Sequence, residues 1–457
     1  MRSCRAVAGV AVAPSDAARR GGDVRAGDPA KRRDPGMTST TDAPAAPPAP
    51  TVARLPSLTG LRWIAALLVF GFHAGTMRII AEPDYKAVID ALFTLGLSGV
   101  QFFFILSGFV LVWSARPGGS RLTFWRRRIA KIYPNHLVLF AATLGVAWWF
   151  ADPVLPAAAV ENLLLLQAWD PRPGWFYSIN TVSWSLSCEF FFYLCLPLAL
   201  PLLRRARPSV LWTLIIALPL LILALWPAQH LVPEVSRWWF TQIFPPARSL
   251  EFWLGAVAAE LMLRGLWRGP RLTAATAIFV VTWVTAAQWI PAQWWTTLLA
   301  VAYLLVITAA ADADVSGRRS PWRSRPLVWL GEVSFAFYLV HVLVMTSVLR
   351  YSGDWGTGFR GWRGPAVVLG FLLVNLVLAG LLHRFVETPM MRRLAPRRPR
   401  RPPVVPRQRA GDTDTAVGGS AQAAVADARG AEAGSAPTDA GGGSGRTDER
   451  SSYVDLR

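Results

Sequence analysis

RWIAALLVFGFH, residues 62–73, places ten apolar residues between an arginine and a histidine. Apolar runs of about 20 residues recur from Leu58 to Glu387, and arginines are clustered between them. About 20 apolar residues is the length that an α-helix needs to cross the hydrocarbon core of a bilayer. The sequence therefore predicts an all-α polytopic membrane protein.

The composition of the 457 residues agrees with a membrane protein. Hydrophobic residues make up 53% of the chain, and its mean hydropathy is +0.34. The net charge of +19 reflects basic residues in both tails and, above all, between the apolar runs, where positive charge fixes the orientation of a membrane protein. We therefore expect no nucleic-acid partner. Three cysteines form no disulfide framework and no metal-binding spacing, so no metal site is expected.

The apolar runs predict about ten transmembrane helices, at 58–80, 91–113, 132–150, 184–203, 209–226, 238–263, 272–290, 295–311, 327–350 and 364–387. Every second linker is basic, and these linkers hold Arg116, Arg121, Arg126, Arg127, Arg128, Lys131, Arg204, Arg205, Arg207, Arg264, Arg268, Arg271, Arg318, Arg319, Arg323 and Arg325. This alternation predicts a multi-pass protein of a bacterial plasma membrane with both termini in the cytoplasm.

Low-complexity composition predicts that the two ends of the chain, residues 1–53 and 394–457, are disordered tails. Residues 54–393 then form a single membrane domain. The stretch ENLLLLQAW, residues 161–169, is too short to span a bilayer. We interpret it as an interfacial or re-entrant helix on the outer side.

Arg62 and His73 lie on the same face of the first predicted span. They are eleven residues apart, which is about 16 Å along an α-helix. A charged residue at the centre of a span costs roughly 2.5–3.5 kcal/mol, so its default interpretation is functional. The structural alternatives are an arginine that reaches the membrane surface and a core histidine that a neighbouring helix satisfies.

Two further polar residues are expected at the depth of His73. Glu189 lies about five residues into span four from the outer side, roughly 8 Å below the surface. His341 lies in the outer half of span nine and shares one helix face with Ser334 and Tyr338. Three ionisable groups at one level predict a hydrated cavity with acid–base chemistry.

The predicted cytoplasmic side carries a basic stretch, FWRRRIAKIYP at 124–134, with Arg126, Arg127, Arg128 and Lys131. These cations either anchor the next span or bind the phosphates of a nucleotide-containing donor. Small residues in GLSGVQFFFILSGF, residues 96–109, include Ser107. They permit close helix contact or leave a slot for a narrow donor arm.

These elements, in this order, resemble the acyltransferase 3 family of integral-membrane O-acyltransferases. The matching elements are the arginine and histidine of 62–73, GVQFFFILSGF at 99–109, RRRIAKIYP, SWSLSCEFFFY with Glu189, FPPARSLEFWLG, GEVSFAFYLVH ending at His341, and RFVETP at 384–389. The resemblance implies acyl transfer from cytoplasmic acyl-CoA, usually acetyl-CoA, to a hydroxyl group. It also implies that His73 and Arg62 are essential and that Glu189 supports them.

One position departs from the family pattern, since Lys131 stands where the family often has the second arginine of Arg-x-x-Arg. The positive charge remains, but the planar fork that grips phosphate is lost. The compact form of the chain is more similar to members that acylate macrolide-type natural products or glycolipids.

The working hypothesis is a membrane O-acyltransferase with acyl-CoA as co-substrate and no permanently bound cofactor. His73 acts as general base and Glu189 orients its imidazole. Arg62 holds the donor or stabilises developing negative charge. The substrate-binding residues are Arg126, Arg127, Arg128, Lys131, Ser107, Tyr338 and His341. The acceptor is a hydroxyl of a glycan, a glycolipid or a macrolide-type natural product. The alternative is a secondary transporter, although no internal repeat is visible.

Overall fold

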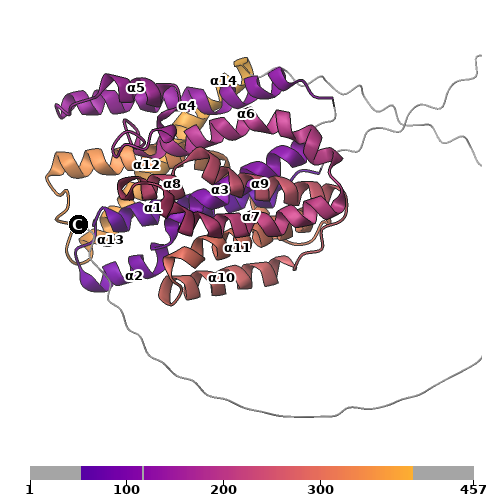
Figure 1. Ribbon diagram of the computed structural model, residues 1–457. Helices are drawn as coiled ribbons and strands as arrows, with labels where there is room; N and C mark the ends of the chain where they lie inside the picture. The colour runs from indigo at the N-terminus through magenta and orange to yellow at the C-terminus, as the bar shows by residue number, and fades with distance from the viewer. Residues whose placement is uncertain (1–52, 116–117, 395–457) are drawn as a thin grey trace, which may run out of the picture. The chain divides into compact units, whose positions relative to one another are not determined.

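The computed structural model describes residues 53–115 and 118–394, which form a bundle of α-helices (Figure 1). Apart from residues 53 and 394, the predicted tails lie outside these ranges. The helices are α1 (Pro56–Thr76), α2 (Pro83–Phe93), α3 (Gly99–Ser114), α4 (Arg121–Trp149), α5 (Pro156–Leu163), α6 (Trp184–Arg205), α7 (Pro208–Ala228), α8 (Arg237–Gln242), α9 (Pro245–Leu263), α10 (Leu272–Gln288), α11 (Ala292–Val315), α12 (Arg325–Ser352), α13 (Arg363–Leu382) and α14 (Thr388–Leu394).

Local sequence explains where many of these helices begin. Proline occupies one of the first two positions of α1, α2, α5, α7, α9 and α12. Proline suits this place because its fixed φ is helical and the first backbone N–H groups of a helix have no partner within it. The start of α4 is instead capped by Ser120, whose hydroxyl accepts a hydrogen bond from the backbone N–H of Thr123.

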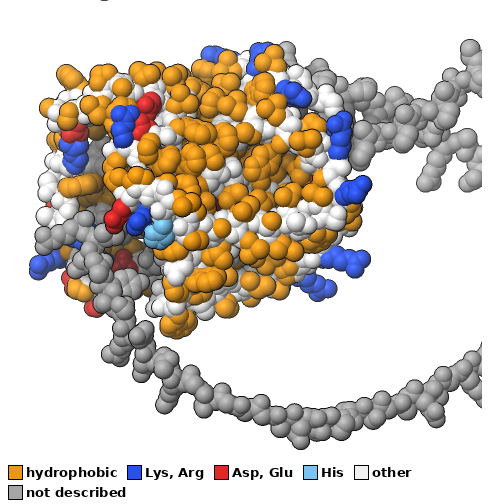
Figure 2. All heavy atoms as spheres, viewed as in Figure 1, with side chains coloured by type: hydrophobic (Ala, Val, Ile, Leu, Met, Phe, Trp, Pro, Cys, Tyr) orange, Lys and Arg blue, Asp and Glu red, His pale blue; other side chains and the backbone are white. Residues whose placement is uncertain are grey.

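Eight helices in the described ranges are long and apolar enough to cross a membrane. These are Pro56–Thr76, Pro83–Ser114, Arg121–Trp149, Thr181–Arg205, Pro208–Leu231, Gln293–Val315, Arg325–Ser352 and Arg363–Leu394. The other two predicted spans correspond to α9 and α10, with 19 and 17 residues. Figure 2 shows a broad apolar surface between the two ends of the bundle. The prediction of an all-α multi-pass membrane protein is confirmed.

The bundle has one end at which arginines gather, here called the arginine-rich end. At this end α3, α6, α9 and α11 finish and α1, α4, α7, α10 and α12 begin. Arg204 at the end of α6 donates to the carbonyl of Ala115 after α3, and Arg264 after α9 donates to the carbonyls of Leu203 and Ala206. Basic side chains line this end at the right of Figure 2.

Glycines set the closest helix contacts in the core. A Cβ atom on Gly108 of α3 would lie 1.9 Å from the carbonyl oxygen of Phe252, and one on Gly255 of α9 would lie 1.8 Å from that of Ile105. A Cβ on Gly331 of α12 would similarly meet the carbonyl of Thr59 on α1. Of the two roles considered for the small residues of 96–109, close helix contact is therefore the one that Gly108 performs.

The segment between α4 and α6 does not span the bundle. It contains α5, two 3₁₀ turns (Gln167–Trp169 and Thr181–Ser183) and the loop between them. Near its end, the Asn180 side chain donates to the carbonyl of Leu339, and the Tyr338 hydroxyl donates to the carbonyl of Val182. Both Leu339 and Tyr338 lie in the middle of α12, so the segment dips into the bundle. As a result, α6 begins level with the middle of α12.

Candidate active site

Two histidines from distant parts of the chain meet inside the bundle. His73 lies near the end of α1 and His341 in the second half of α12, and His73 Nδ1 is 3.1 Å from His341 Nε2. The helices are parallel and closely packed, which brings the two imidazoles to one level. His341 is fully buried, whereas His73 is half-buried. Of the pair, only His73 is accessible from outside the protein core.

Each imidazole is also held by the backbone of its own helix. His73 Nδ1 lies 2.9 Å from the carbonyl oxygen of Val69, and His341 Nδ1 lies 2.7 Å from that of Tyr338. The ring of Phe337 is nearly parallel to that of His341, at 4°, and Phe70 packs against both of these rings. Backbone contacts therefore hold both imidazoles, and aromatic packing further fixes the ring of His341.

Glu189 forms a second polar centre, on α6. Its carboxylate accepts a hydrogen bond of 2.8 Å from the hydroxyl of Tyr193, and Ser107 also hydrogen-bonds to that tyrosine. Arg62 and two cations of α4 lie close enough to interact electrostatically with the carboxylate. A buried charge needs such compensation. Glu189 therefore belongs to a cluster of charges that joins α1, α4 and α6.

The expected contact between Glu189 and His73 is not made, and the sequence-based depth of Glu189 was wrong. Ser185 at the start of α6 hydrogen-bonds to Tyr338. From that level, Glu189 lies four residues, about 6 Å, toward the arginine-rich end, and His341 lies three residues, about 4.5 Å, toward the opposite end. The prediction failed because it started α6 at the membrane surface rather than at mid-bundle.

The four predicted phosphate ligands on α4 have different surroundings. Arg126 is exposed, while Arg127 and Arg128 are half-buried. The guanidinium of Arg128 lies 5.8 Å from the ring centre of Phe124 and 5.9 Å from that of Tyr193. Lys131 forms an ion pair with Glu387. Part of the charge of Lys131 is therefore already balanced within the protein.

Glu387 is a buried charge that was not among the predicted site residues. It accepts hydrogen bonds from Lys131 and from Asn135, at 3.1 Å for the latter, and lies 3.3 Å from His383 Nδ1. A π-helical turn over His383–Glu387 positions it. Such turns are rare and often mark functional sites. Its sequence signal was an acidic residue that ends the last apolar run within RFVETP.

The hydroxyl of Tyr338 also makes its hydrogen bonds within the protein. Its hydroxyl lies 2.8 Å from that of Ser185 and 3.1 Å from the carbonyl oxygen of Val182. These contacts anchor the start of α6 to α12, and the side chain is buried. The geometry gives Tyr338 a structural role. In the described ranges, no group of three or more His, Cys, Asp or Glu side chains could hold a metal ion.

A cavity of about 400 Å³ opens between α4, α5 and α12, at the end away from the arginine-rich end. Its wall includes Leu343 and Thr346 of α12. At 100° per residue, these lie about 200° and 140° around the helix from His341. The cavity therefore lies on the face of α12 turned away from the histidine pair.

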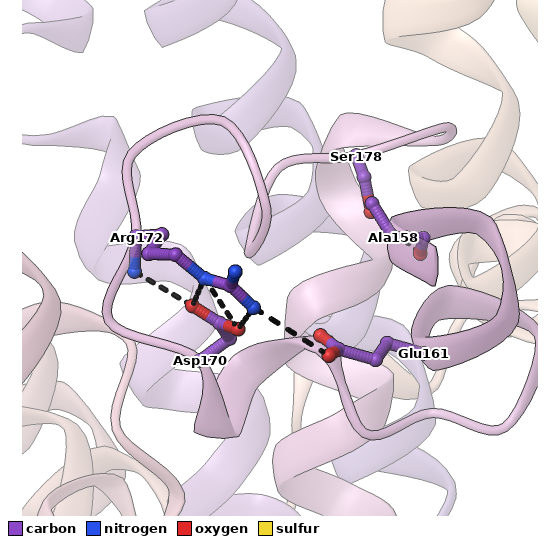
Figure 3. A network of polar contacts seen from close by, with 5 residues as sticks. All are labelled: Ala158, Glu161, Asp170, Arg172 and Ser178. Carbon is purple, nitrogen blue, oxygen red and sulfur yellow. Dashed lines mark hydrogen bonds and ion pairs between the residues drawn. The ribbon is translucent and has the colours of Figure 1, made fainter. Parts of the chain in front are cut away.

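Polar contacts hold the α5 segment that forms one wall of this cavity (Figure 3). Ser178 donates a hydrogen bond of 3.3 Å to the carbonyl of Ala158, and Arg172 binds Asp170 through its backbone and its guanidinium. Glu161 lies 4.0 Å from Arg172. Hydrogen bonds from Arg172 lower the pKa of the Asp170 carboxyl, so this pair remains charged at neutral pH.

Comparison with known proteins identifies the family. The family model of an acyltransferase domain, acyltransferase 3, matches residues 55–384. The chain belongs to this acyltransferase family. The match covers every helix that contributes to the histidine pair and to the cluster around Glu189. The protein is therefore a membrane-embedded acyltransferase, and the transporter alternative is set aside.

Several known proteins are similar to most of this chain. Acyltransferase MdmB of Streptomyces mycarofaciens is 42% identical over 77% of this chain and 95% of its own length. Exopolysaccharide production protein ExoZ of Rhizobium meliloti is 25% identical over 67% of this chain and 93% of its own length. Peptidoglycan O-acetyltransferase OatA of Listeria monocytogenes is 24% identical over 74% of this chain and 56% of its own length. No solved structure matches the chain.

Proposed function

We propose that the protein transfers an acyl group, most simply acetyl, from acyl-CoA to a hydroxyl group, with His73 as general base. The observation that carries this assignment is the half-buried imidazole of His73, which is held through Nδ1. Its Nε2 has no hydrogen-bond partner among the described residues. An imidazole fixed at one nitrogen and open at the other is the arrangement that general-base catalysis uses.

The donor binds from the arginine-rich end. Arg62, Arg126, Arg127 and Arg128 offer guanidinium groups to the phosphates of CoA. Lys131 contributes less than expected, because Glu387 binds it. Arg62 lies about 16 Å along α1 from His73. Of its two expected roles, holding the donor therefore suits the geometry better than stabilising charge at the acyl carbon.

The reaction needs one proton to move through His73. Nε2 takes the proton of the acceptor hydroxyl while the acceptor oxygen forms a bond to the acyl carbon. The carbon–sulfur bond of the thioester breaks, and the proton passes to the CoA sulfur, which leaves as the thiol. Transfer through an acyl-histidine would use the same Nε2 as nucleophile. In this scheme, the charges around Glu189 hold the donor-binding cations in place.

The acceptor is proposed to be a hydroxyl of a glycan, a glycolipid or a macrolide-type natural product. The names of two relatives refer to peptidoglycan O-acetyl transfer and to exopolysaccharide production. We place the protein in a bacterial plasma membrane with both termini in the cytoplasm, in the domain 54–393. The arginine-rich end then faces the cytoplasmic pool of acyl-CoA.

The proposal is tested with acetyl-CoA that carries a radiolabelled acetyl group and with purified membranes that contain the protein. An extract of the cells from which the membranes come is added as the source of the acceptor. Wild-type membranes are expected to transfer label to extractable compounds and to release CoA. His73→Ala should lower this rate about 10²- to 10⁴-fold, the usual contribution of a general base. Mass spectrometry of the labelled compounds then identifies the acceptor.

His230→Ala is a matched control, because His230 is an exposed histidine in the turn after α7. This variant should keep the wild-type rate at equal expression. Wild-type activity in the His73→Ala variant would refute the assignment of the base. The absence of any label transfer or CoA release by the wild type would refute the acyl-CoA reaction as a whole.

A further inference from the structure

His341 was expected to bind substrate, but its contacts indicate another role. Its side chain has no solvent exposure, and both of its ring nitrogens lie near protein atoms. Nδ1 lies 2.7 Å from the carbonyl of Tyr338, and Nε2 lies 3.1 Å from His73 Nδ1. A group enclosed in this way does not touch a substrate. It acts on the reaction only through the residue that it contacts, which is His73.

The hydrogen bonds allow only one arrangement of protons for two neutral rings. A carbonyl oxygen only accepts hydrogen bonds, so His341 must carry its proton on Nδ1, facing Tyr338. His341 Nε2 is then an acceptor. His73 Nδ1 lies between two acceptors, Val69 O at 2.9 Å and His341 Nε2 at 3.1 Å, so it must carry the proton of His73. His73 Nε2 is left with a free lone pair.

The opposite arrangement is unfavourable at two places. A proton on His341 Nε2 would leave its Nδ1 lone pair 2.7 Å from the carbonyl oxygen of Tyr338. It would also leave the Nδ1 lone pair of His73 facing the carbonyl oxygen of Val69 at 2.9 Å. Two acceptors in contact repel each other and leave buried polar groups unsatisfied.

We infer that His341 is a positioning residue that holds His73 in the tautomer with a free Nε2 and supports the imidazolium that forms when Nε2 takes a proton. This inference rests on the proposed function of His73. The backbone carbonyl of Tyr338 fixes His341, and His341 in turn fixes His73. A neutral imidazole thus takes the place that a carboxylate occupies in the Ser-His-Asp arrangement.

Two substitutions separate this role from simple packing. His341→Phe keeps a ring of similar size but removes the acceptor at Nε2. We expect it to lower kcat about 10- to 100-fold, the effect of losing a hydrogen bond to a charged group. The KM for acetyl-CoA should not change, because the donor binds elsewhere. His341→Gln restores an acceptor near the position of Nε2 and should recover most of the loss.

His136→Phe is the matched control for loss of a buried imidazole. His136 is a buried histidine of α4 whose Nε2 lies 3.0 Å from the carbonyl oxygen of Asn162. A purely structural role of His341 predicts that the Phe and Gln variants lose similar activity, in proportion to their loss of thermal stability, as His136→Phe does. That pattern would overturn the inference.

Nitrogen NMR of the wild-type protein tests the tautomer even if the variants fail to fold. The chain has five histidines, so ¹⁵N-histidine labelling gives a simple spectrum, and the His73→Ala variant assigns the signals of His73. A neutral His73 protonated at Nδ1 supports the inference, and one protonated at Nε2 refutes it. If His73→Ala is inactive while His341→Phe has the wild-type kcat, the proposed function stands and only the role of His341 falls.

Discussion

At the scale of single residues, sequence spacing placed Arg62 and His73 on one face of α1. It did not identify the partner of His73. Spacing along a helix shows which residues share a face, but the neighbour across the helix boundary depends on how α1 and α12 pack. Glu189 was the expected partner and His341 was expected to bind substrate, but packing at the Gly331 contact brings the imidazole of His341 rather than the carboxylate to His73.

Glu387 was missed for a different physical reason. An acidic residue at the end of an apolar run usually lies in water at the membrane surface, where its charge needs no partner in the protein. Here Glu387 has a side-chain exposure of only 3% and binds Lys131. The burial arises because the last helices turn onto α4, which the sequence alone does not reveal.

The Lys131–Glu387 pair leads to a prediction on stability. Glu387→Gln removes the charge that balances Lys131 and should destabilise the protein by about 3–5 kcal/mol, the usual effect of breaking a buried ion pair. The double variant Lys131→Met/Glu387→Leu should be closer to wild type, because it removes both charges of the pair. Thermal unfolding in detergent measures both. A Glu387→Gln variant as stable as wild type would contradict the prediction.

At the scale of helices, the sequence located the spans well but not their depth. The short segment at 161–169 was correctly expected to be non-spanning, because its apolar run is too brief. How far it enters the bundle depends on side-chain hydrogen bonds such as that of Asn180 to the carbonyl of Leu339. Such a bond has no signature in the hydropathy pattern, and the depth of Glu189 was misjudged for this reason.

The contact of α3 with α9 gives a prediction for a single glycine. Gly255→Leu places a side chain where even a Cβ would lie 1.8 Å from the carbonyl oxygen of Ile105. The helices must separate, and we expect a loss of at least about 1–3 kcal/mol. Thermal unfolding in detergent measures it. Gly145→Leu is the control, because a Cβ added to Gly145 of α4 would have no neighbouring atom within 4 Å, so this position should tolerate the change.

At the scale of the whole molecule, the alternating charge of the linkers agrees with the arrangement of the helices. The arginines of every second described linker lie together at one end of the bundle. This is required because successive spans run in opposite directions, so every second linker returns to the same end. The sequence could predict this because the charge pattern records how the chain is inserted. The number of spans was harder to predict, because α9 carries buried charges such as Arg248 and Glu251, which lie 3.0 Å apart.

The orientation of the bundle can be tested with single cysteines in a background without the native ones. Ser316→Cys lies in an exposed turn at the arginine-rich end, and Thr357→Cys in an exposed loop at the opposite end. A membrane-impermeant maleimide should label the cysteine at position 357 in intact cells. It should label the one at position 316 only after permeabilisation. The reverse pattern would show that the arginine-rich end faces outward.

The pairing of α1 with α12 also has a consequence in time. His73 and His341 are separated by 268 residues, and a ribosome adds about 5–20 residues per second. The first histidine therefore waits roughly 13–54 s in the growing chain before its partner has even been synthesised. Until then the proposed acid–base centre does not exist, and a chain interrupted before α12 carries the imidazole of His73 without the ring that we infer to orient it.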